Sequence, residues 1–413
     1  MDRTVDTIPL AATSSAPRRS TLAQRLVLGR LENLSHGRLE VVLPDGSRRH
    51  FGERDATLQA QLTVHHPRVF QRLVRGADVG VGEAYTAGEW SSPDLVALVR
   101  LFLANEELLS ASPWLGALTT TANRLRHLLR ANTRSGSRRN ISAHYDLSNQ
   151  LYELFLDPSM SYSAAYFSSP EASLEEAQHA KYHRLAAMAG LTPGQHVLEI
   201  GCGWGGLAIE AVRATGCRVT GITVSKKQFD FARRRVAAGG YAKRIDIKLC
   251  DYRRLQGRFD HIISVEMLEA VGHAYLGTFF NCCDRLLKPG GKVVIQTITI
   301  PDPHYARYRR EADWIQKHIF PGACIPSLTA LCTAMTGHSR LVVEHIENIG
   351  SHYVPTLQAW RRRFRRNRAK VLAMGFDRRF ARKWDYYLSL CEAGFAEKAL
   401  GDLQMVLTRP SRA

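Results

Sequence analysis

The sequence predicts an α/β fold with a mostly parallel sheet, preceded by a smaller N-terminal domain that is mostly helical. The main observation is an alternation, from about residue 190, of short β-rich runs with helical stretches, which is typical of parallel strands joined by crossover helices. The β-rich runs are 196–201, 218–225, 245–250, 261–267 and 292–300, and two of the helical stretches are 226–238 and 271–287. A second observation is the length of 413 residues, which favours two domains over one.

Composition divides the chain into four segments. Residues 1–20 are rich in Ser, Ala and Pro and predict a disordered tail. Residues 21–110 mix a strand-like piece near 39–43 with helical stretches, of which 95–109 is strongly apolar, and predict the N-terminal domain. A basic linker follows at 111–141, and the α/β domain takes residues 142–413.

The net charge of +18 is concentrated in two segments. Residues 121–140 hold six arginines and no acid, and residues 356–385 hold eleven Lys or Arg against two Asp. Such clusters indicate an anionic partner, and both a nucleic acid and an anionic membrane fit. In the second segment Leu357, Trp360, Phe364 and Val371 fall near one helical face, which predicts either an amphipathic membrane surface or packing on the core.

No long apolar segment is present. A run of about 18 apolar residues and a secretory signal are both missing, so the sequence predicts a cytoplasmic protein without a transmembrane helix. The eight cysteines form no C-x-x-C pair. Neither a zinc site nor a disulfide framework is therefore expected, which agrees with a reducing compartment.

A glycine loop follows the first predicted strand. Gly201, Gly203 and Gly206 have the spacing of a loop that approaches a nucleotide cofactor, but the spacing alone also fits a dinucleotide. Glu199 lies inside the strand, where a carboxylate suits S-adenosylmethionine (SAM), and Asp251 follows the third strand, where it could meet the adenine amino group. The second strand ends without the acid that holds an NAD ribose. The loop therefore favours SAM over a nicotinamide cofactor.

Several motifs, in order along residues 140–410, resemble those of the cyclopropane-fatty-acyl-phospholipid synthase and mycolic acid cyclopropane synthase family. Residues 38–105 resemble the family's N-terminal domain more faintly. The matching segments are 144–149, 152–157, 160–163, 198–208, 264–272, 314–316, 319–322 and 391–395.

The resemblance implies a class I, Rossmann-like SAM-methyltransferase fold for residues 142–413 and a lipid-associating N-terminal domain. It implies transfer of a methyl(ene) group from SAM to the cis double bond of an unsaturated phospholipid acyl chain, giving a cyclopropane fatty acid. It further implies a homodimer, peripheral on the inner face of an anionic membrane. An apolar, dry pocket is needed so that water does not capture the intermediate cation.

The family's site residues carry over onto this sequence position by position. Glu269 and Tyr353 match residues that hold a bicarbonate ion, the family's base, and Cys391 matches a cysteine sometimes assigned as catalytic. A buried structural role is favoured for Cys391, because the chemistry needs no thiol nucleophile. With Glu199 and Asp251, the positions expected to contact the cofactor are Tyr162, Ser163, Gly201, Gly203, Thr223, Gln228 and Tyr252.

Two positions depart from the family's pattern. Its usual cysteine after Tyr-Ser is Ala164, and its usual histidine after the fifth strand is Gln296, which can donate a hydrogen bond but cannot carry charge. The departures put bicarbonate in doubt and leave open a methyl-branched unsaturated product in place of the ring. A nucleic-acid methyltransferase is less favoured, because residues 266–269 lack the Asn/Asp-Pro-Pro-aromatic element. A non-catalytic lipid-binding protein would not explain the glycine loop.

Overall fold

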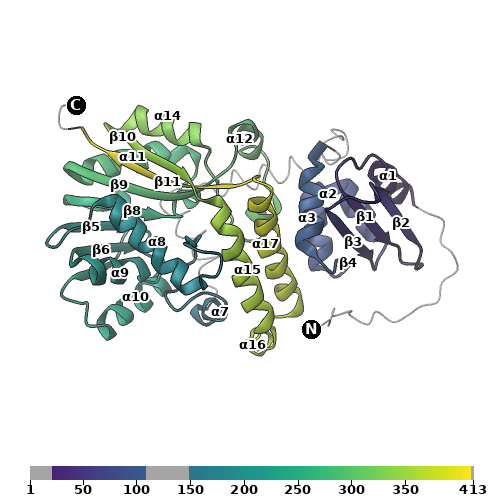
Figure 1. The fold of residues 1–413 in the computed structure, drawn as a ribbon, viewed down its shortest axis with the longest axis horizontal. Helices are drawn as coiled ribbons and strands as arrows, with labels where there is room; N and C mark the ends of the chain where they lie inside the picture. Colours follow the sequence, from purple (N-terminus) through teal and green to yellow (C-terminus); the bar gives the residue numbers. More distant parts are fainter. Residues whose placement is uncertain (1–20, 108–147, 411–413) are drawn as a thin grey trace. The chain divides into compact units, whose positions relative to one another are not determined.

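The computed structural model describes residues 21–107 and 148–410, which form two compact units. Within the described residues the smaller unit comprises 21–107, 312–314 and 368–397, and the larger comprises 148–311, 315–367 and 398–410. Figure 1 shows both units. The predicted tail at 1–20 and the basic linker at 111–141 lie outside the described residues.

A seven-stranded sheet forms the centre of the larger unit, in the order β10-β11-β9-β8-β5-β6-β7. Strands β5 to β9 pair in parallel, and β10 and β11 add two antiparallel strands at one side, so the predicted mostly parallel sheet is confirmed. The strands are β5 (His196–Ile200), β6 (Arg218–Thr223), β7 (Ile245–Leu249), β8 (Phe259–Val265), β9 (Leu287–Thr299), β10 (Val342–Asn348) and β11 (Gly401–Thr408).

Helices cover both faces of this sheet. One apolar core joins the sheet to α8, α9 and α10, and a second joins its other face to α11 and α14. These helices are α8 (Leu174–Ala189), α9 (Gly206–Thr215), α10 (Lys226–Ala238), α11 (Leu276–Leu286) and α14 (Leu328–His338). Helix α8 begins at a capping box in which Ser173 and Glu176 bond each other's backbone N–H. Burial of both faces explains the apolar runs read from the sequence.

The remaining helices of the larger unit are short, apart from α15. They are α7 (Asn149–Glu153), η1 (Tyr252–Arg254), η2 (Leu268–Ala270), η3 (His273–Tyr275), α12 (Asp302–Tyr308), α13 (Trp314–His318) and α15 (Gly350–Arg366). The side chains of Leu357, Trp360 and Phe364 on α15 are almost fully buried. Of the two alternatives predicted for this stripe, packing on the core is therefore the one that the structure shows, and not an amphipathic membrane surface. Val371 is buried as well.

The smaller unit contains a sheet as well as helices. Its strands, β1 (Arg38–Val42), β2 (Arg48–Gly52), β3 (Gln59–Val64) and β4 (Trp90–Ser91), lie in the order β2-β1-β3-β4. Its helices are α1 (Leu22–Leu31), α2 (Arg68–Thr86), α3 (Leu95–Ala104), α16 (Arg368–Ala373) and α17 (Arg378–Ala396). More of its residues lie in helices than in strands, as predicted, but the sequence analysis predicted only the first of the four strands.

The division into units differs from the predicted domain boundary at 111–141, because helix α17 belongs to the smaller unit. It packs against α2 and α3, and its Arg382 donates to the backbone oxygens of Tyr85 and Trp90 at 2.7 and 2.8 Å. Residues 368–397 therefore belong with the N-terminal residues, and the predicted domain 142–413 is not a single compact unit. Among the described residues, no helix is long and apolar enough to cross a bilayer.

Candidate active site

A pocket opens in the larger unit at the carboxyl ends of strands β5 to β8, where a parallel sheet is expected to bind its ligand. All nine residues predicted to contact the cofactor line it. The loop before α8 supplies Tyr162 and Ser163, β5 and the loop after it supply Glu199, Gly201 and Gly203, β6 and α10 supply Thr223 and Gln228, and the segment after β7 supplies Asp251 and Tyr252.

The glycine loop leaves room for a ligand close to the backbone. Gly203 has a φ of +50°, and a Cβ added there would meet no atom within 4 Å, so the space beside it is open. Gly201, with a φ of +86°, is instead required by packing, because an added Cβ would come within 2.9 Å of the Met267 side chain. A bare backbone beside open space is the arrangement that a nucleotide-like ligand needs.

Glu199 is a buried carboxyl group at the base of this pocket. Its side chain is only 5% exposed, and its Oε2 has no hydrogen-bond partner among the described residues. Burial raises the pKa of Glu199 to about 8, although the Lys181 charge and the backbone N–H of Ala208 pull it down. An unpartnered buried acceptor at a ligand pocket fits a ligand that donates hydrogen bonds.

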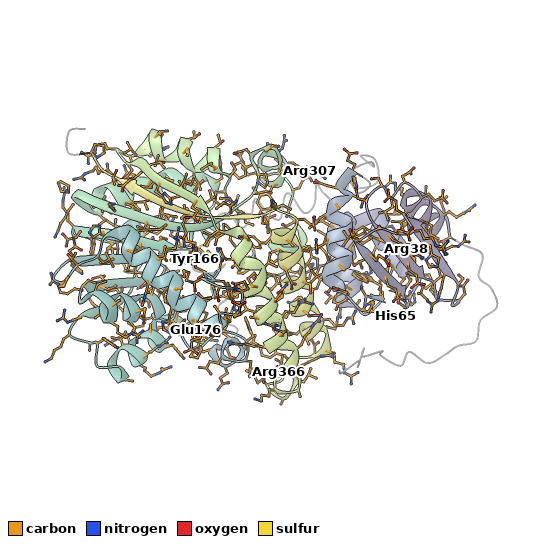
Figure 2. The ribbon with its side chains drawn as sticks, in the orientation of Figure 1. Arg38, His65, Tyr166, Glu176, Arg307 and Arg366 are labelled. Atoms are coloured by element: carbon orange, nitrogen blue, oxygen red, sulfur yellow. The ribbon has the colours of Figure 1, made fainter. Side chains whose placement is uncertain are left out.

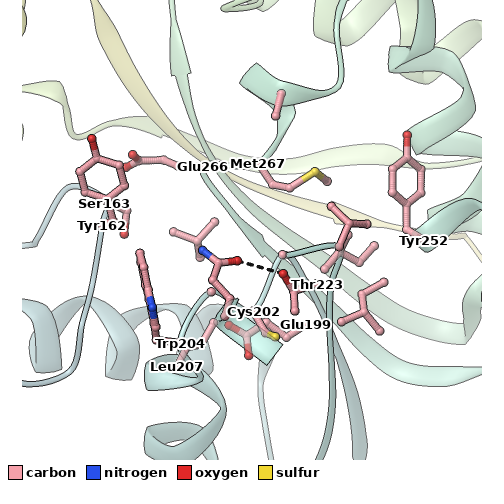
Figure 3. Close-up of a pocket in the computed structure, with 18 of the residues that line it drawn as sticks. Tyr162, Ser163, Glu199, Cys202, Trp204, Leu207, Thr223, Tyr252, Glu266 and Met267 are labelled. Atoms are coloured by element: carbon pink, nitrogen blue, oxygen red, sulfur yellow. Dashed lines mark hydrogen bonds between the residues drawn. The ribbon is translucent and has the colours of Figure 1, made fainter. Parts of the chain in front are cut away.

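Side chains on both sides of the pocket are held in place by hydrogen bonds. The Thr223 hydroxyl donates to Gln228 Oε1 at 2.9 Å, the contact dashed in Figure 3, and fixes the first turn of α10. The carboxylate of Asp251 accepts from Arg253 Nε at 2.9 Å and from its terminal nitrogen at 2.6 Å. Asp251 is thus one half of an ion pair that lines the pocket.

Glu266, the first residue after β8, extends the pocket's polar groups at the end occupied by Tyr162 and Ser163 (Figure 3). Its Oε2 accepts a hydrogen bond from Tyr353 at 2.7 Å, and its Oε1 accepts from the Ala164 backbone at 2.7 Å and from Gln296 Nε2 at 3.0 Å. Its φ of +45° is unusual for a residue with a side chain. Such strain is often found at functional positions.

Four predicted catalytic residues lie outside the residues that line the pocket. Gln296 and Tyr353 both bond Glu266, so the structure brings them to the site through that residue. Glu269 accepts from Thr297 at 3.0 Å and from the Ile298 backbone at 2.5 Å, and its Oε2 is buried without a hydrogen-bond partner among the described residues. The two residues that the resemblance assigned to a bicarbonate ion therefore have different partners, because Tyr353 donates to Glu266 and not to Glu269.

Cys391 lies on α17, in the smaller unit, and does not line the pocket. Burial raises the pKa of its thiol far above the ordinary value, so the thiolate is disfavoured. Both observations agree with the structural role favoured from the sequence.

The site also contains charged and polar residues that the sequence prediction missed. Lys181 on α8 is fully buried and donates to Ser163 Oγ at 2.6 Å, and burial lowers its pKa to about 8. Asp402 on β11 is fully buried and accepts from Gln296 Nε2 at 3.0 Å. Lys181 occupies one of the core-facing positions of α8, and this position in the sequence could have indicated a buried lysine. No such pattern in the sequence indicated that Asp402 is part of the site.

Comparison with known proteins identifies the family. The family model described as mycolic acid cyclopropane synthetase matches residues 132–405. The chain belongs to this family. It is therefore an enzyme of the SAM-dependent methyltransferase class, placed among cyclopropane synthases and related lipid methyltransferases, as the sequence motifs predicted.

Two curated relatives match most of the chain. Tuberculostearic acid methyltransferase UfaA1 of Mycobacterium tuberculosis is 39% identical over 411 residues, 97% of this chain and 93% of that protein. Cyclopropane-fatty-acyl-phospholipid synthase of Escherichia coli is 34% identical over 353 residues, 85% of this chain and 88% of that protein. The two names describe different reactions, so the family alone leaves the product open.

A solved structure supports the cofactor and the fold. Mycolic acid cyclopropane synthase CmaA1, complexed with SAH and CTAB, is 29% identical and covers 65% of this chain and 97% of its own, with a TM-score of 0.62. SAH is the form that SAM takes after it has lost its methyl group. The predicted class I methyltransferase fold and the SAM cofactor are thereby confirmed.

Proposed function

We propose that this enzyme transfers a methyl group from SAM to the cis double bond of an unsaturated phospholipid acyl chain, with Glu266 as the proton acceptor. The observation that carries the proposal is the Glu266 carboxylate, which lines the pocket of the glycine loop and is bonded by Tyr353. SAM supplies an electrophilic methyl group. The electron pair of the double bond forms the new C–C bond, and the positive charge passes to the neighbouring chain carbon.

Glu266 is suited to remove the proton that this carbocation must lose. Burial raises the pKa of Glu266 above its ordinary value, which makes its carboxylate a stronger base. Three donors, from Tyr353, Ala164 and Gln296, orient the two oxygens and keep the charged form available. Because the pocket thus contains its own carboxylate, we propose that bicarbonate is not required.

Aromatic side chains stand behind the same end of the pocket. Tyr162 lines it and stacks on Trp360, with ring centroids 5.2 Å apart, and contacts Tyr152 edge-on at 5.3 Å. Aromatic faces stabilise a nearby cation and exclude the water that would capture it. This environment supports chemistry on an apolar chain.

We propose a methyl-branched unsaturated acyl chain as the product. Support comes from the match to tuberculostearic acid methyltransferase over nearly the whole chain, and from Ala164 and Gln296, which replace the cysteine and histidine of the ring-forming pattern. A cyclopropane is the second candidate, supported by the match to the Escherichia coli synthase. The two products differ in whether proton loss leaves a double bond or closes a ring.

Mass spectrometry before and after catalytic hydrogenation separates the two products. Both add one CH₂ to the acyl chain, but only the branched olefin takes up H₂ under mild conditions. We expect uptake of H₂, and turnover that does not depend on added bicarbonate. A product that resists hydrogenation would establish the ring, and a bicarbonate requirement would contradict the assignment of Glu266 as sole base.

Binding of SAM should release a proton from Glu199. With its pKa near 8 this carboxyl group is mostly protonated at pH 7, and a ligand that donates to it favours the ionised form. SAM affinity is therefore expected to rise with pH up to about 8 and then to level. Calorimetry in two buffers of different ionisation enthalpy measures the release. Equal apparent enthalpies, or a release that persists in Glu199→Gln, would contradict the assignment.

We propose that the enzyme reaches its lipid as a peripheral protein on the cytoplasmic face of an anionic membrane. Support comes from the last two turns of α15, where Arg362, Arg365 and Arg366 are exposed and Arg361 is half-buried (Arg366 is labelled in Figure 2). Because the apolar face of α15 is buried, the attraction is electrostatic. The homodimer and the lipid-associating role of the N-terminal residues stay predictions.

Replacing Arg361, Arg362, Arg365 and Arg366 by Gln should weaken binding to anionic vesicles by about 10²–10³-fold, at about 1 kcal/mol for each charge. The matched control removes four charges elsewhere on the larger unit, at Arg218, Arg233, Arg234 and Arg258. Vesicle co-sedimentation at two salt concentrations measures both. Equal losses in the two variants would show that only net charge matters, and tighter binding to RNA than to vesicles would contradict the membrane proposal.

A further inference from the structure

A chain of hydrogen bonds leads from the partly exposed side chain of Arg184 to the pocket. Arg184 Nε on α8 donates to Gln404 Oε1 at 2.7 Å, and Gln404 Nε2 donates to Gln296 Oε1 at 3.0 Å. Gln296 Nε2 then donates to Glu266 Oε1 at 3.0 Å. Both glutamines are fully buried, and they face each other as directly paired residues of β11 and β9.

Groups at both ends of this chain favour one direction of its hydrogen bonds, and the arginine fixes the outer end. A guanidinium group has only donors, so the end of the Gln404 amide that faces Arg184 must be its oxygen. The NH₂ group of Gln404 therefore faces the oxygen of Gln296, and the NH₂ group of Gln296 faces Glu266. With the opposite direction, the Gln296 oxygen would face the acceptor atoms of Glu266 and Asp402, which lie 3.0 Å from its nitrogen.

Arg184 is itself held by its surroundings. Its terminal nitrogen pairs with Glu347 on β10, and its guanidinium lies 4.6 Å from the ring centre of Tyr166, which is labelled in Figure 2. The side chain is 26% exposed, so this end of the chain of hydrogen bonds is near solvent, whereas the other end is the pocket carboxylate. The arginine does not line the pocket, and its hydrogen-bonded connection to the pocket carboxylate runs through the two amides.

We propose that Arg184 is a positioning residue that acts through Gln404 and Gln296 to keep a hydrogen-bond donor aimed at Glu266. The inference rests on the proposed role of Glu266 as proton acceptor. A donor to the ionised carboxylate favours that form and opposes the effect of burial. The charged and titratable groups that surround Glu266 are Lys181 from α8, Tyr353 from α15, Asp402 from β11 and Glu269 from η2.

Arg184→Met and Gln404→Met test the proposal, because the first removes the donor at the outer end of the chain and the second removes the amide that connects this donor to Gln296. Without a directed donor, Glu266 holds its proton to higher pH. We expect the acid limb of the activity–pH profile to move to higher pH. On the acid side of the profile, turnover should fall by about threefold to tenfold, which corresponds to the free energy of one hydrogen bond. Turnover on the alkaline plateau is kept. Arg184→Lys, which still presents only donors, should restore part of the profile.

Glu347→Gln is the matched control for Arg184. It removes the ion pair of Arg184 but leaves the donation to Gln404, so its activity–pH profile should equal that of the wild type. A shift in Glu347→Gln as large as in Arg184→Met would show that the ion pair matters and not the amides. Such a result would overturn the proposal.

A titration without SAM separates this proposal from the proposed function. The ¹³C carboxyl signal of Glu266, identified by its absence in Glu266→Gln, should titrate at higher pH in both methionine variants. An unmoved titration overturns the role of Arg184, whatever the activity. Full turnover of Glu266→Gln would instead overturn the proposed function. Gln404 is fully buried, whereas Arg184 is partly exposed and its replacement is better tolerated by the fold. If Gln404→Met does not fold, the titration of Arg184→Met alone tests the proposal.

Discussion

Glu266→Gln is expected to lower turnover by about 10²–10⁴-fold, the usual contribution of general acid–base catalysis, with SAM affinity unchanged. The amide has the shape of the carboxyl group, so its oxygen can still accept from Ala164 and Gln296, and its NH₂ group can face the Tyr353 hydroxyl. Only the capacity to take up a proton is lost. The rate of SAH formation and calorimetry with SAM measure the two effects separately.

Glu269→Gln is the matched comparison, because it makes the same change three residues along in a carboxyl group that does not line the pocket. Burial, with the nearby Glu266 charge, raises the pKa of Glu269 to about 8, so near neutral pH its neutral form is already favoured. We expect the smaller loss of turnover from this variant. A loss confined to Glu269→Gln would contradict Glu266 as the base and favour the arrangement that the family resemblance implied, in which Glu269 helps to hold a bicarbonate ion.

Gly203→Val is expected to abolish measurable SAM binding while leaving the sheet folded. The valine side chain would enter the open space beside the loop, where the backbone of Gly203 borders the pocket. Its φ of +50° adds a backbone cost of about 1–2 kcal/mol for a residue with a Cβ. Calorimetry gives the affinity, and circular dichroism shows whether the fold is kept.

The control for backbone strain is Gly190→Val. Gly190 ends α8 with a φ of +68°, is exposed, and also has open space around it, but it lies outside the pocket lining. The two valine variants should lose similar stability, and only Gly203→Val should lose SAM. Wild-type SAM affinity in Gly203→Val would contradict the placement of the cofactor at the glycine loop.

Local patterns predicted the pocket well because its residues follow strands that could be recognised one by one. Glu199 lies one residue before the end of its strand, Thr223 ends its strand and Asp251 follows its strand, and in a parallel sheet those ends lie side by side. The predicted helix at 226–238 has the bounds that the structure gives α10. Sequence spacing and strand direction indicated the glycine loop, Glu199 and Asp251, and the family resemblance supplied the other predicted cofactor contacts. All nine line one pocket.

Contacts made by distant segments were beyond such reasoning. Asp402 and Gln404 reach Gln296 only because β11 inserts between β10 and β9, an order that no local pattern reveals. Helix α17 joins the N-terminal residues through packing that the basic composition of its segment does not indicate. Glu266 was missed for another reason: the predicted strand ran two residues too far and included it.

The most direct test of the central claim is the fate of a labelled methyl group. The purified enzyme is incubated with methyl-labelled SAM and vesicles of an anionic phospholipid with cis-monounsaturated acyl chains, beside vesicles with matched saturated chains and beside RNA. The proposed function predicts label in the acyl chain of the unsaturated lipid alone. Unlabelled unsaturated lipid in the presence of bound SAM, or label in the RNA, would contradict it.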